Sequence, residues 1–171
     1  MQSVVIADAS PLIALARLQH LHLLKALFRE ILITDIVQHE ILQGGAFSDS
    51  AELEQAIKAG WLQVVRFEMP AITDDFNASV EGLDAGEASS IRWAAHLKQQ
   101  QQAVLLVMDE AKGRAVARRL SLHLIGSAGV LALAKRSGLI LSVQPLLEQL
   151  QKSGYFLSDA VINAALKMAG E

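Results

Sequence analysis

The amino-acid sequence predicts an α/β fold, with a short and mostly parallel sheet of about five strands flanked by helices. Three observations favour this fold. Short apolar runs alternate with helical stretches along the chain. The runs are apolar almost throughout, as in strands that are covered on both faces. No repeat is visible in the 171 residues, and this length suits a single domain over residues 1–171.

The first half of the chain supplies three of the expected strands. Residues 3–7 (SVVIA) predict a buried strand, after which Ser10 suits the N-cap of a helix and Pro11 its first position. Thr34 suits the N-cap of a later helix, which the glycine pair at 44–45 would end. The expected strands are 3–7, 31–33 and 62–67, and the expected helices are 11–18, 21–28, 35–42 and 50–59.

The second half begins with an irregular stretch and then returns to the same alternation. Residues 69–81 contain a proline, an asparagine and the adjacent Asp74 and Asp75, so a loop is expected there. Residues 103–108 (AVLLVM) predict a strongly buried strand. The other expected elements are a strand at 122–125, helices at 85–98, 110–120 and 128–137, and two closing helices near 143–170, at 145–152 and 159–168.

The composition excludes several classes of protein. Without cysteine the chain has no disulfide, thiolate zinc site, iron–sulfur cluster or cysteine nucleophile. The 15 basic and 18 acidic side chains give a net charge of −3, which argues against coating nucleic acid by bulk charge. The apolar start lacks a basic flank, and the longest run without a formal charge, 120–134, is shorter than the roughly 20 residues of a membrane span. A cytoplasmic location is therefore expected.

Two aspartates directly follow expected strands. Asp8 comes after the strand at 3–7, and Asp109 comes after the strand at 103–108. In open parallel sheets, binding sites form at the carboxyl ends of strands, near the point where the strand order reverses. Either aspartate alone could simply be the polar residue that ends a strand.

Glu40 lies on the apolar side of the helix expected at 35–42. It follows Ile36 by four residues and Val37 by three, so it shares their helical face. A carboxylate facing the core needs a partner, a raised pKa or a metal ion. The alternative is a glutamate at the edge of the stripe that reaches out to water.

Glu87 shares a helical face with Leu83 and Ile91, at spacings of four residues. The same residue also completes a capping box with Asp84, in which Glu87 folds back onto the backbone of residue 84. Spacing alone leaves the core-facing and the capping interpretation of Glu87 open.

Taken together, the four carboxylates predict a cation site. Like charges in one cleft raise each other's pKa, so the four could not all stay ionised unaided. A hard divalent cation such as Mg²⁺ or Mn²⁺ resolves this, because it prefers oxygen ligands. Such a site can activate water and stabilise the charge that builds up on a phosphodiester.

Four segments of the chain, taken in order, resemble PIN-domain nucleases. The resemblance covers nearly the whole chain. Within the family, the chain most resembles the subfamily of small prokaryotic PIN-like proteins that begin D-x-S-P-L-I. It implies a Rossmann-like α/β fold whose acidic cluster binds Mg²⁺ or Mn²⁺ and cuts single-stranded or structured RNA. The segments are VVIADASPLIAL (4–15), ITDIVQHEIL (33–42), LDAGEASSIRWA (83–94) and VLLVMDEAKGRAVARRLSLHLIGSAGVLALAKRSGLI (104–140).

The resemblance also assigns roles to individual positions. It gives the metal-binding and catalytic acids, with Ser10 as a supporting hydroxyl. Glu87 departs from the family pattern, in which aspartate is commoner at the third position. Glu110 follows Asp109, so which of the two faces the metal stays open. Ser127 stands where members often have a hydroxyl residue, or serves only as an N-cap. The four acids, in order, are Asp8, Glu40, Glu87 and Asp109.

Partners follow from the resemblance as well. Many bacterial members are toxins that a small antitoxin protein neutralises, and many form homodimers. RNA is the implied substrate, and Lys112 and Arg114 are candidates for binding its phosphates. A solvated helix face explains these two basic residues equally well.

Two other functions stay open at this point. One is a PIN-like scaffold that has lost activity and binds protein or RNA. The other is a receiver-like signalling domain, which would need paired acids after the first strand, where Asp8 stands alone.

Overall fold

The computed structural model describes residues 3–43, 48–68 and 79–171, and this part of the chain contains one five-stranded sheet. Every strand pairing in it is parallel. The predicted α/β fold and mostly parallel sheet are therefore confirmed. The strands are β1 (Val4–Ala7), β2 (Ile31–Thr34), β3 (Leu62–Val65), β4 (Val104–Val107) and β5 (His123–Ile125).

The strand order is β3-β2-β1-β4-β5, with β1 in the centre. The chain moves outward from β1 to β3 on one side and then from β4 to β5 on the other, so the order reverses between β1 and β4. Ligands of open α/β sheets bind beyond the carboxyl ends of the strands at such a reversal. This order also differs from the 2-1-3-4-5 order of receiver domains, so the receiver-like interpretation is wrong.

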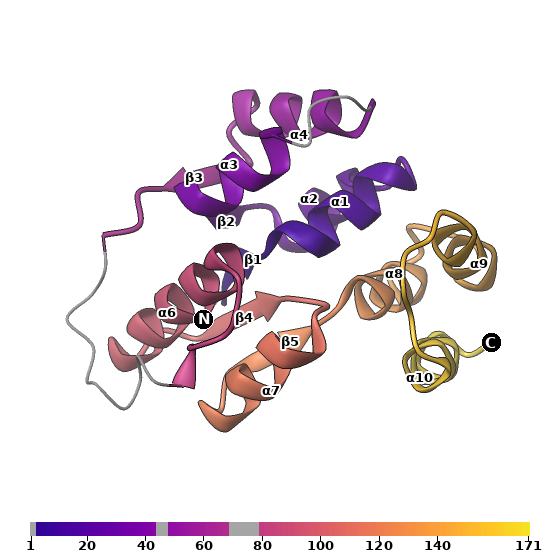
Figure 1. Ribbon diagram of the computed structural model, residues 1–171. Coiled ribbons are helices and arrows are strands. Elements are labelled where there is room, and N and C mark those ends of the chain that lie inside the picture. Colours follow the sequence, from indigo (N-terminus) through magenta and orange to yellow (C-terminus); the bar gives the residue numbers. More distant parts are fainter. Residues whose placement is uncertain (1–2, 44–47, 69–78) are drawn as a thin grey trace.

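Helices cover both faces of the sheet, and three further helices extend from the β5 end (Figure 1). α6 contacts β4, β2 and β1, and α10 lies along α8. No helix in the described ranges is long and apolar enough to cross a membrane. The helices are α1 (Ala9–Arg17), α2 (His22–Phe28), α3 (Asp35–Gln43), α4 (Ser48–Lys58), α6 (Ala85–Gln99), α7 (Ala111–Arg119), α8 (Ser127–Arg136), α9 (Gln144–Lys152) and α10 (Asp159–Ala169).

Alternate side chains of the central strand enter two hydrophobic cores, because successive residues of a strand point to opposite faces of a sheet. Val5 and Ala7 of β1 join a larger core with side chains of α1–α4 and α8–α10. Ile6, between them, joins a smaller core with side chains of α6 and α7. Leu106 of β4 is also fully buried in the smaller core. Both faces of the sheet are thus covered, as the uninterrupted apolar strands predicted.

The element boundaries differ from the predicted ones mainly at helix starts. α1 begins at Ala9 with Asp8 at its N-cap, so the prediction that Ser10 is the N-cap is wrong. Gly126 is the N-cap of α8, so Ser127 does not have the capping role considered for it. Thr34 does cap α3, since its Oγ1 accepts a 3.1 Å hydrogen bond from the Val37 amide.

Two sequence predictions fall outside the described residues. They are the glycine pair at 44–45 and the loop that contains residues 74 and 75.

Candidate active site

Asp8 is the most deeply buried of the predicted site acids, with 2% of its surface exposed. Its backbone amide continues the sheet by donating a 3.0 Å hydrogen bond to the Val107 carbonyl, so the side chain projects from the carboxyl end of β1. The pKa of Asp8 is raised to about 8. Burial is the main cause; the Ala9 amide lowers the pKa, and the charges of Asp84, Glu87 and Glu40 add to the rise. Oδ1 of Asp8 is buried and has no hydrogen-bond partner in the described part of the chain.

Glu40 reaches from α3 to the start of α6. Its Oε1 accepts a 2.9 Å hydrogen bond from the Gly86 amide. Burial raises the pKa of Glu40, and the charge of Asp84 raises it further. A Cβ at position 86 would lie 2.7 Å from this Oε1, so the contact requires glycine there. Glu40 is half-buried between two helices, which agrees with the core-facing interpretation of its spacing.

Glu87 combines the two roles that its spacing left open. It is 5% exposed, and it completes a capping box: its Oε2 accepts from the Asp84 amide at 3.3 Å and its own amide donates to Asp84 Oδ1 at 2.8 Å. The pKa of Glu87 is raised by burial first and then by Asp84, with smaller contributions from Glu110 and Glu40. Oε1 of Glu87 stays buried without a hydrogen-bond partner among the residues that the structure describes. One oxygen therefore caps the helix, while the other is buried and unpaired among the described residues.

Asp109 lies at the carboxyl end of β4, with both carboxylate oxygens engaged. Oδ1 accepts a 2.8 Å hydrogen bond from the amide of Ser127, the first residue of α8. Oδ2 accepts a 2.6 Å hydrogen bond from the hydroxyl of Tyr155. Glu110 is exposed at the N-cap of α7 and adds to the raised pKa of Glu87. The two neighbouring acids thus interact with different groups. Asp109 bonds the start of α8, and the charge of Glu110 acts on Glu87.

Tyr155 is a site residue that the sequence analysis missed. It lies between α9 and α10, 46 residues from Asp109 along the chain. Burial raises the pKa of the Tyr155 phenol far above its usual value, and the charge of Asp109 raises it further. No local periodicity marks such a contact; the only signal in the sequence is that Tyr155 is the single tyrosine of the chain.

The remaining predicted site residues lie on α1 and α7. Ser10 is in the first turn of α1 and is half-buried. Lys112 is exposed on α7. Arg114 is half-buried and donates a 2.6 Å hydrogen bond to the Met108 carbonyl. Its guanidinium thus supports the end of β4, whereas Lys112 faces solvent.

The chain matches a known protein family along almost its whole length. The family model DUF3368, described as a PIN domain, matches residues 4–171. The chain belongs to the PIN-domain family. No curated protein matches the sequence. PIN domains are generally nucleases, and they typically use divalent metal ions. The family resemblance predicted from the sequence is confirmed, and the fold is of the nuclease type.

The acids of this PIN domain offer carboxylate oxygens, which are the ligands that a hard divalent cation prefers. Asp8, Glu40 and Glu87 are close enough to influence each other's pKa, and Asp8 and Glu87 each bury an oxygen that has no hydrogen-bond partner in the described ranges. Buried carboxylate oxygens are costly to leave unpaired, and a divalent cation would pair them. As the side chains stand, however, no three histidine, aspartate or glutamate residues among those described are placed to hold one ion. Glu40, Glu87 and Asp109 each bind a backbone amide instead.

A hollow in the surface lies away from this PIN-domain site. It is lined by side chains at the amino ends of β1 and β2, among them Val5, Phe28, Arg29 and Leu32. The acids follow the carboxyl ends of the strands, so this hollow is at the opposite edge of the sheet and adds nothing to the acidic group.

Proposed function

We propose that this PIN domain is a metal-dependent endoribonuclease that hydrolyses RNA phosphodiester bonds at the acidic group. The observation that carries the proposal is the buried carboxyl of Asp8, whose Oδ1 has no hydrogen-bond partner among the described residues and whose pKa the charges of Glu40 and Glu87 help to raise. A buried carboxyl surrounded by other carboxylates is unfavourable for folding alone, and perturbed carboxyl groups of this kind gather at functional sites.

The proposal assigns separate tasks to the residues of the site. Asp8, Glu40, Glu87 and Asp109 would hold Mg²⁺ or Mn²⁺, which when bound activates water and stabilises charge on the phosphodiester. Gly86 holds the carboxylate of Glu40 in place through its amide, and Asp84 does the same for Glu87. Lys112, exposed on α7 close to Asp109 in the chain, would bind a phosphate of the RNA.

The direct test is cleavage of single-stranded and structured RNA with Mg²⁺ or Mn²⁺. The wild type should cleave, and Asp8→Asn should lose at least about a hundredfold in rate, since a group that acts on the reacting centre is removed. Asp159→Asn is the matched control, because Asp159 is exposed on α10. Cleavage that survives Asp8→Asn would contradict the assignment of the site.

One feature favours the alternative of an inactive PIN-like scaffold that binds protein or RNA. No three acids or histidines of the described ranges stand ready for one ion. The scaffold predicts RNA binding without cleavage at any metal concentration. A folded wild type that binds RNA and never cuts it would support this function over the nuclease.

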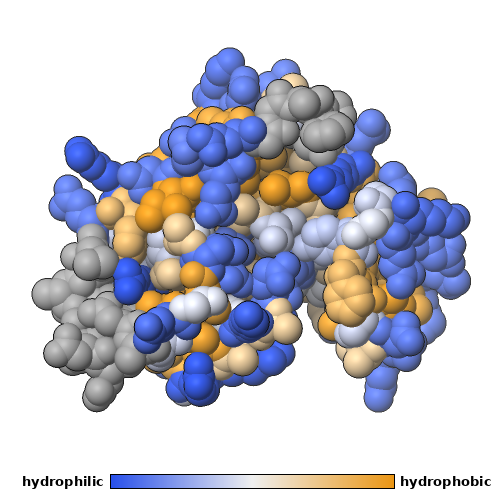
Figure 2. Space-filling view, in the orientation of Figure 1, coloured by the Kyte–Doolittle hydropathy of each residue, from blue (hydrophilic) through white to orange (hydrophobic). Residues whose placement is uncertain are grey.

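We also propose that the protein acts in the cytoplasm as the toxin of a toxin–antitoxin pair and forms a homodimer. In support, the exposed large apolar side chains of the described residues all lie within 139–168, and the C-terminal helices carry pale orange surface among the hydrophilic residues in Figure 2. Leu141 is 96% exposed and Phe156 is 87% exposed. Contiguous exposed apolar surface is typical of protein interfaces.

Two measurements test this partnership. Expression of the wild type should arrest growth, and expression of Asp8→Asn should not. Light scattering should give the mass of a dimer for the wild type and a smaller mass for Leu141→Ser. Normal growth together with a monomeric mass would remove both the toxin role and the homodimer.

A further inference from the structure

We propose that Tyr155 is a positioning residue for Asp109. The helix pair α9–α10 places the Tyr155 hydroxyl beside the Asp109 carboxylate of the acidic group. This inference rests on the proposed function. Tyr155 touches neither reacting atoms nor cation in the proposal. It acts through the 2.6 Å hydrogen bond that its hydroxyl donates to Oδ2 of Asp109.

The surroundings of Asp109 leave its carboxylate a single orientation. Oδ1 is held by the Ser127 amide at 2.8 Å, and Oδ2 is held by Tyr155. Oδ1 fits against the backbone of Gly126, since a Cβ at that position would lie 2.6 Å from it. Each carboxylate oxygen has two lone pairs and uses one here, so one on each oxygen remains for a cation.

Tyr155 owes its position to the packing around α9 and α10. Its amide donates a 3.1 Å hydrogen bond to the Leu150 carbonyl at the end of α9. Leu157, two residues later, is buried in the larger core. The aromatic ring of Tyr155 packs against the same core. The hydroxyl is therefore placed by the helix pair rather than by a free loop.

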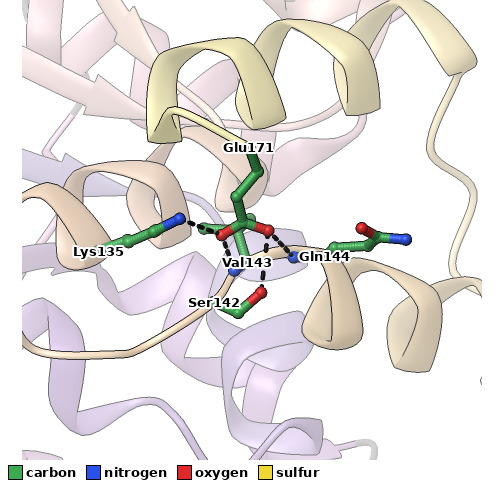
Figure 3. Close-up of polar contacts among 5 residues, drawn as sticks. All are labelled: Lys135, Ser142, Val143, Gln144 and Glu171. Carbon is green, nitrogen blue, oxygen red and sulfur yellow. Dashed lines mark hydrogen bonds and ion pairs between the residues drawn. The ribbon is translucent and has the colours of Figure 1, made fainter.

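A second contact fixes the helix pair at the far end of α10. The Glu171 carboxylate joins α10 to the start of α9 and to α8 (Figure 3). It accepts from the amides of Val143 at 2.7 Å and Gln144 at 3.0 Å, and from Lys135 Nζ at 2.7 Å. Tyr155 thus joins the connection between α9 and α10 to the end of β4, and Glu171 joins the far end of α10 to α8 and to the start of α9.

The chemistry of the contact indicates a role beyond packing. A buried tyrosine hydroxyl needs only one acceptor, and backbone carbonyls commonly meet that need. Here the acceptor is a carboxylate at the carboxyl end of β4, beside the reversal of strand order. Groups that orient metal-binding carboxylates in this way are worth about tenfold to a hundredfold in metal affinity or activity when they are removed.

The test compares Tyr155→Phe with the wild type. The variant keeps the ring in the core and removes the hydroxyl alone. We expect the Mn²⁺ concentration for half-maximal cleavage to rise about tenfold to a hundredfold, with most of the rate recovered at saturating Mn²⁺. Ser153→Ala is the matched control, since its hydroxyl bonds only the Leu150 carbonyl, at 2.7 Å, in the same connection.

A second readout does not depend on activity. Because Tyr155 is the only tyrosine, fluorotyrosine incorporation gives a single fluorine NMR signal from this site. Paramagnetic Mn²⁺ should broaden that signal in the wild type and leave it sharp in Asp8→Asn.

The outcomes separate the inference from the proposed function. An unchanged Mn²⁺ requirement in Tyr155→Phe, with a lower melting temperature, would make the contact structural and overturn the inference alone. A folded wild type that neither cleaves RNA nor shows Mn²⁺ broadening would overturn the proposed function and the inference with it.

Discussion

The Gly86 amide donates a 2.9 Å hydrogen bond to Oε1 of Glu40, which joins the first turn of α6 to the side of α3. The contact depends on the missing side chain at position 86. A Cβ there would lie 2.7 Å from Oε1 and closer still to Oε2. Gly86 thus positions an acid of the site. A side chain at this position would displace the Glu40 carboxylate, whereas the helix itself does not require glycine there.

Gly86→Ala should therefore reduce activity without unfolding the protein. Alanine is favoured over glycine in a helix by up to ~1 kcal/mol, and the group that must move is the end of a flexible glutamate side chain. We expect an unchanged or higher melting temperature and a metal-dependent cleavage rate that falls at least about tenfold. Cleavage assays and thermal unfolding on the same preparation check both.

Gly129→Ala is the control for this substitution. A Cβ at 129, in α8, would meet Ile125 Cγ1 at 2.8 Å and no carboxylate. It should alter stability and leave the metal requirement unchanged. If Gly86→Ala cleaves like the wild type, the position of Glu40 does not matter for the reaction.

The fold could be predicted because its signals are local. The two central strands, β1 and β4, are uninterrupted apolar runs, and Thr34 caps α3 as its side chain suggested. Ser10 was misplaced because two residues that can cap a helix, Asp8 and Ser10, stand two positions apart. The bond from the Asp8 amide to the Val107 carbonyl keeps residue 8 extended, so the helix begins directly after it. That hydrogen bond comes from the neighbouring strand, which no local pattern reveals.

The site could be predicted only in part. Helical spacing placed Glu40 and Glu87 toward the interior. It could not show that the Glu87 carboxylate caps a helix with one oxygen and buries the other without a partner among the described residues. The contact between Asp109 and its partner Tyr155 could not be predicted from the sequence. Tyr155 approaches it from the connection between α9 and α10, and the path of that connection depends on Glu171 and on the packing of two helices.

The contribution of Asp8 to the stability of the metal-free protein should fall as pH rises. Asp8 has an ordinary pKa of 3.8 in the unfolded chain and about 8 in the folded protein. Between these values the folded state holds a proton that the unfolded state releases, so the contribution of Asp8 to stability is complete below pH 3.8 and is lost as the pH rises to about 8. Each pH unit in this window costs at most ~1.4 kcal/mol.

Asp8→Asn removes this dependence. In chelator near pH 7.5, we expect the variant to be more stable than the wild type by a few kcal/mol at most, on the order of magnitude set by the same linkage. Urea unfolding across the pH range measures the slope. Parallel slopes for the two proteins would mean that Asp8 is ionised in the folded state.

The hydrogen bonds of Glu171 clamp the end of α10 to α8 and to the start of α9. Their contribution to stability should show the opposite pH dependence. Hydrogen bonds from Lys135 and from the Val143 amide hold the pKa of Glu171 at about 2, below its ordinary 4.5. Its stabilising effect is therefore complete above pH 4.5 and is lost as the pH falls toward 2. Glu171→Gln should lower the melting temperature at neutral pH, and the difference from the wild type should shrink toward pH 2.

Glu148→Gln is the control for Glu171→Gln. Glu148 lies on α9 and accepts one surface hydrogen bond, of 3.0 Å, from the Gln144 side chain. Exposed pairs of this kind contribute little to stability. If both substitutions shift the melting temperature equally, Glu171 does not act as a clamp.

Lys112 should contribute to RNA affinity and not to the chemical step. Its side chain is exposed on α7, whereas Arg114 on the same helix is engaged with the Met108 carbonyl. Each phosphate contact on a single strand contributes roughly 0.7 to the slope of log affinity against log salt. Lys112→Ala should therefore reduce that slope by roughly 0.7, raise KM at low salt and leave kcat unchanged. Lys58→Ala, the same change on the exposed face of α4, should do neither. An equal loss of affinity in both variants would mean that RNA responds to net charge alone.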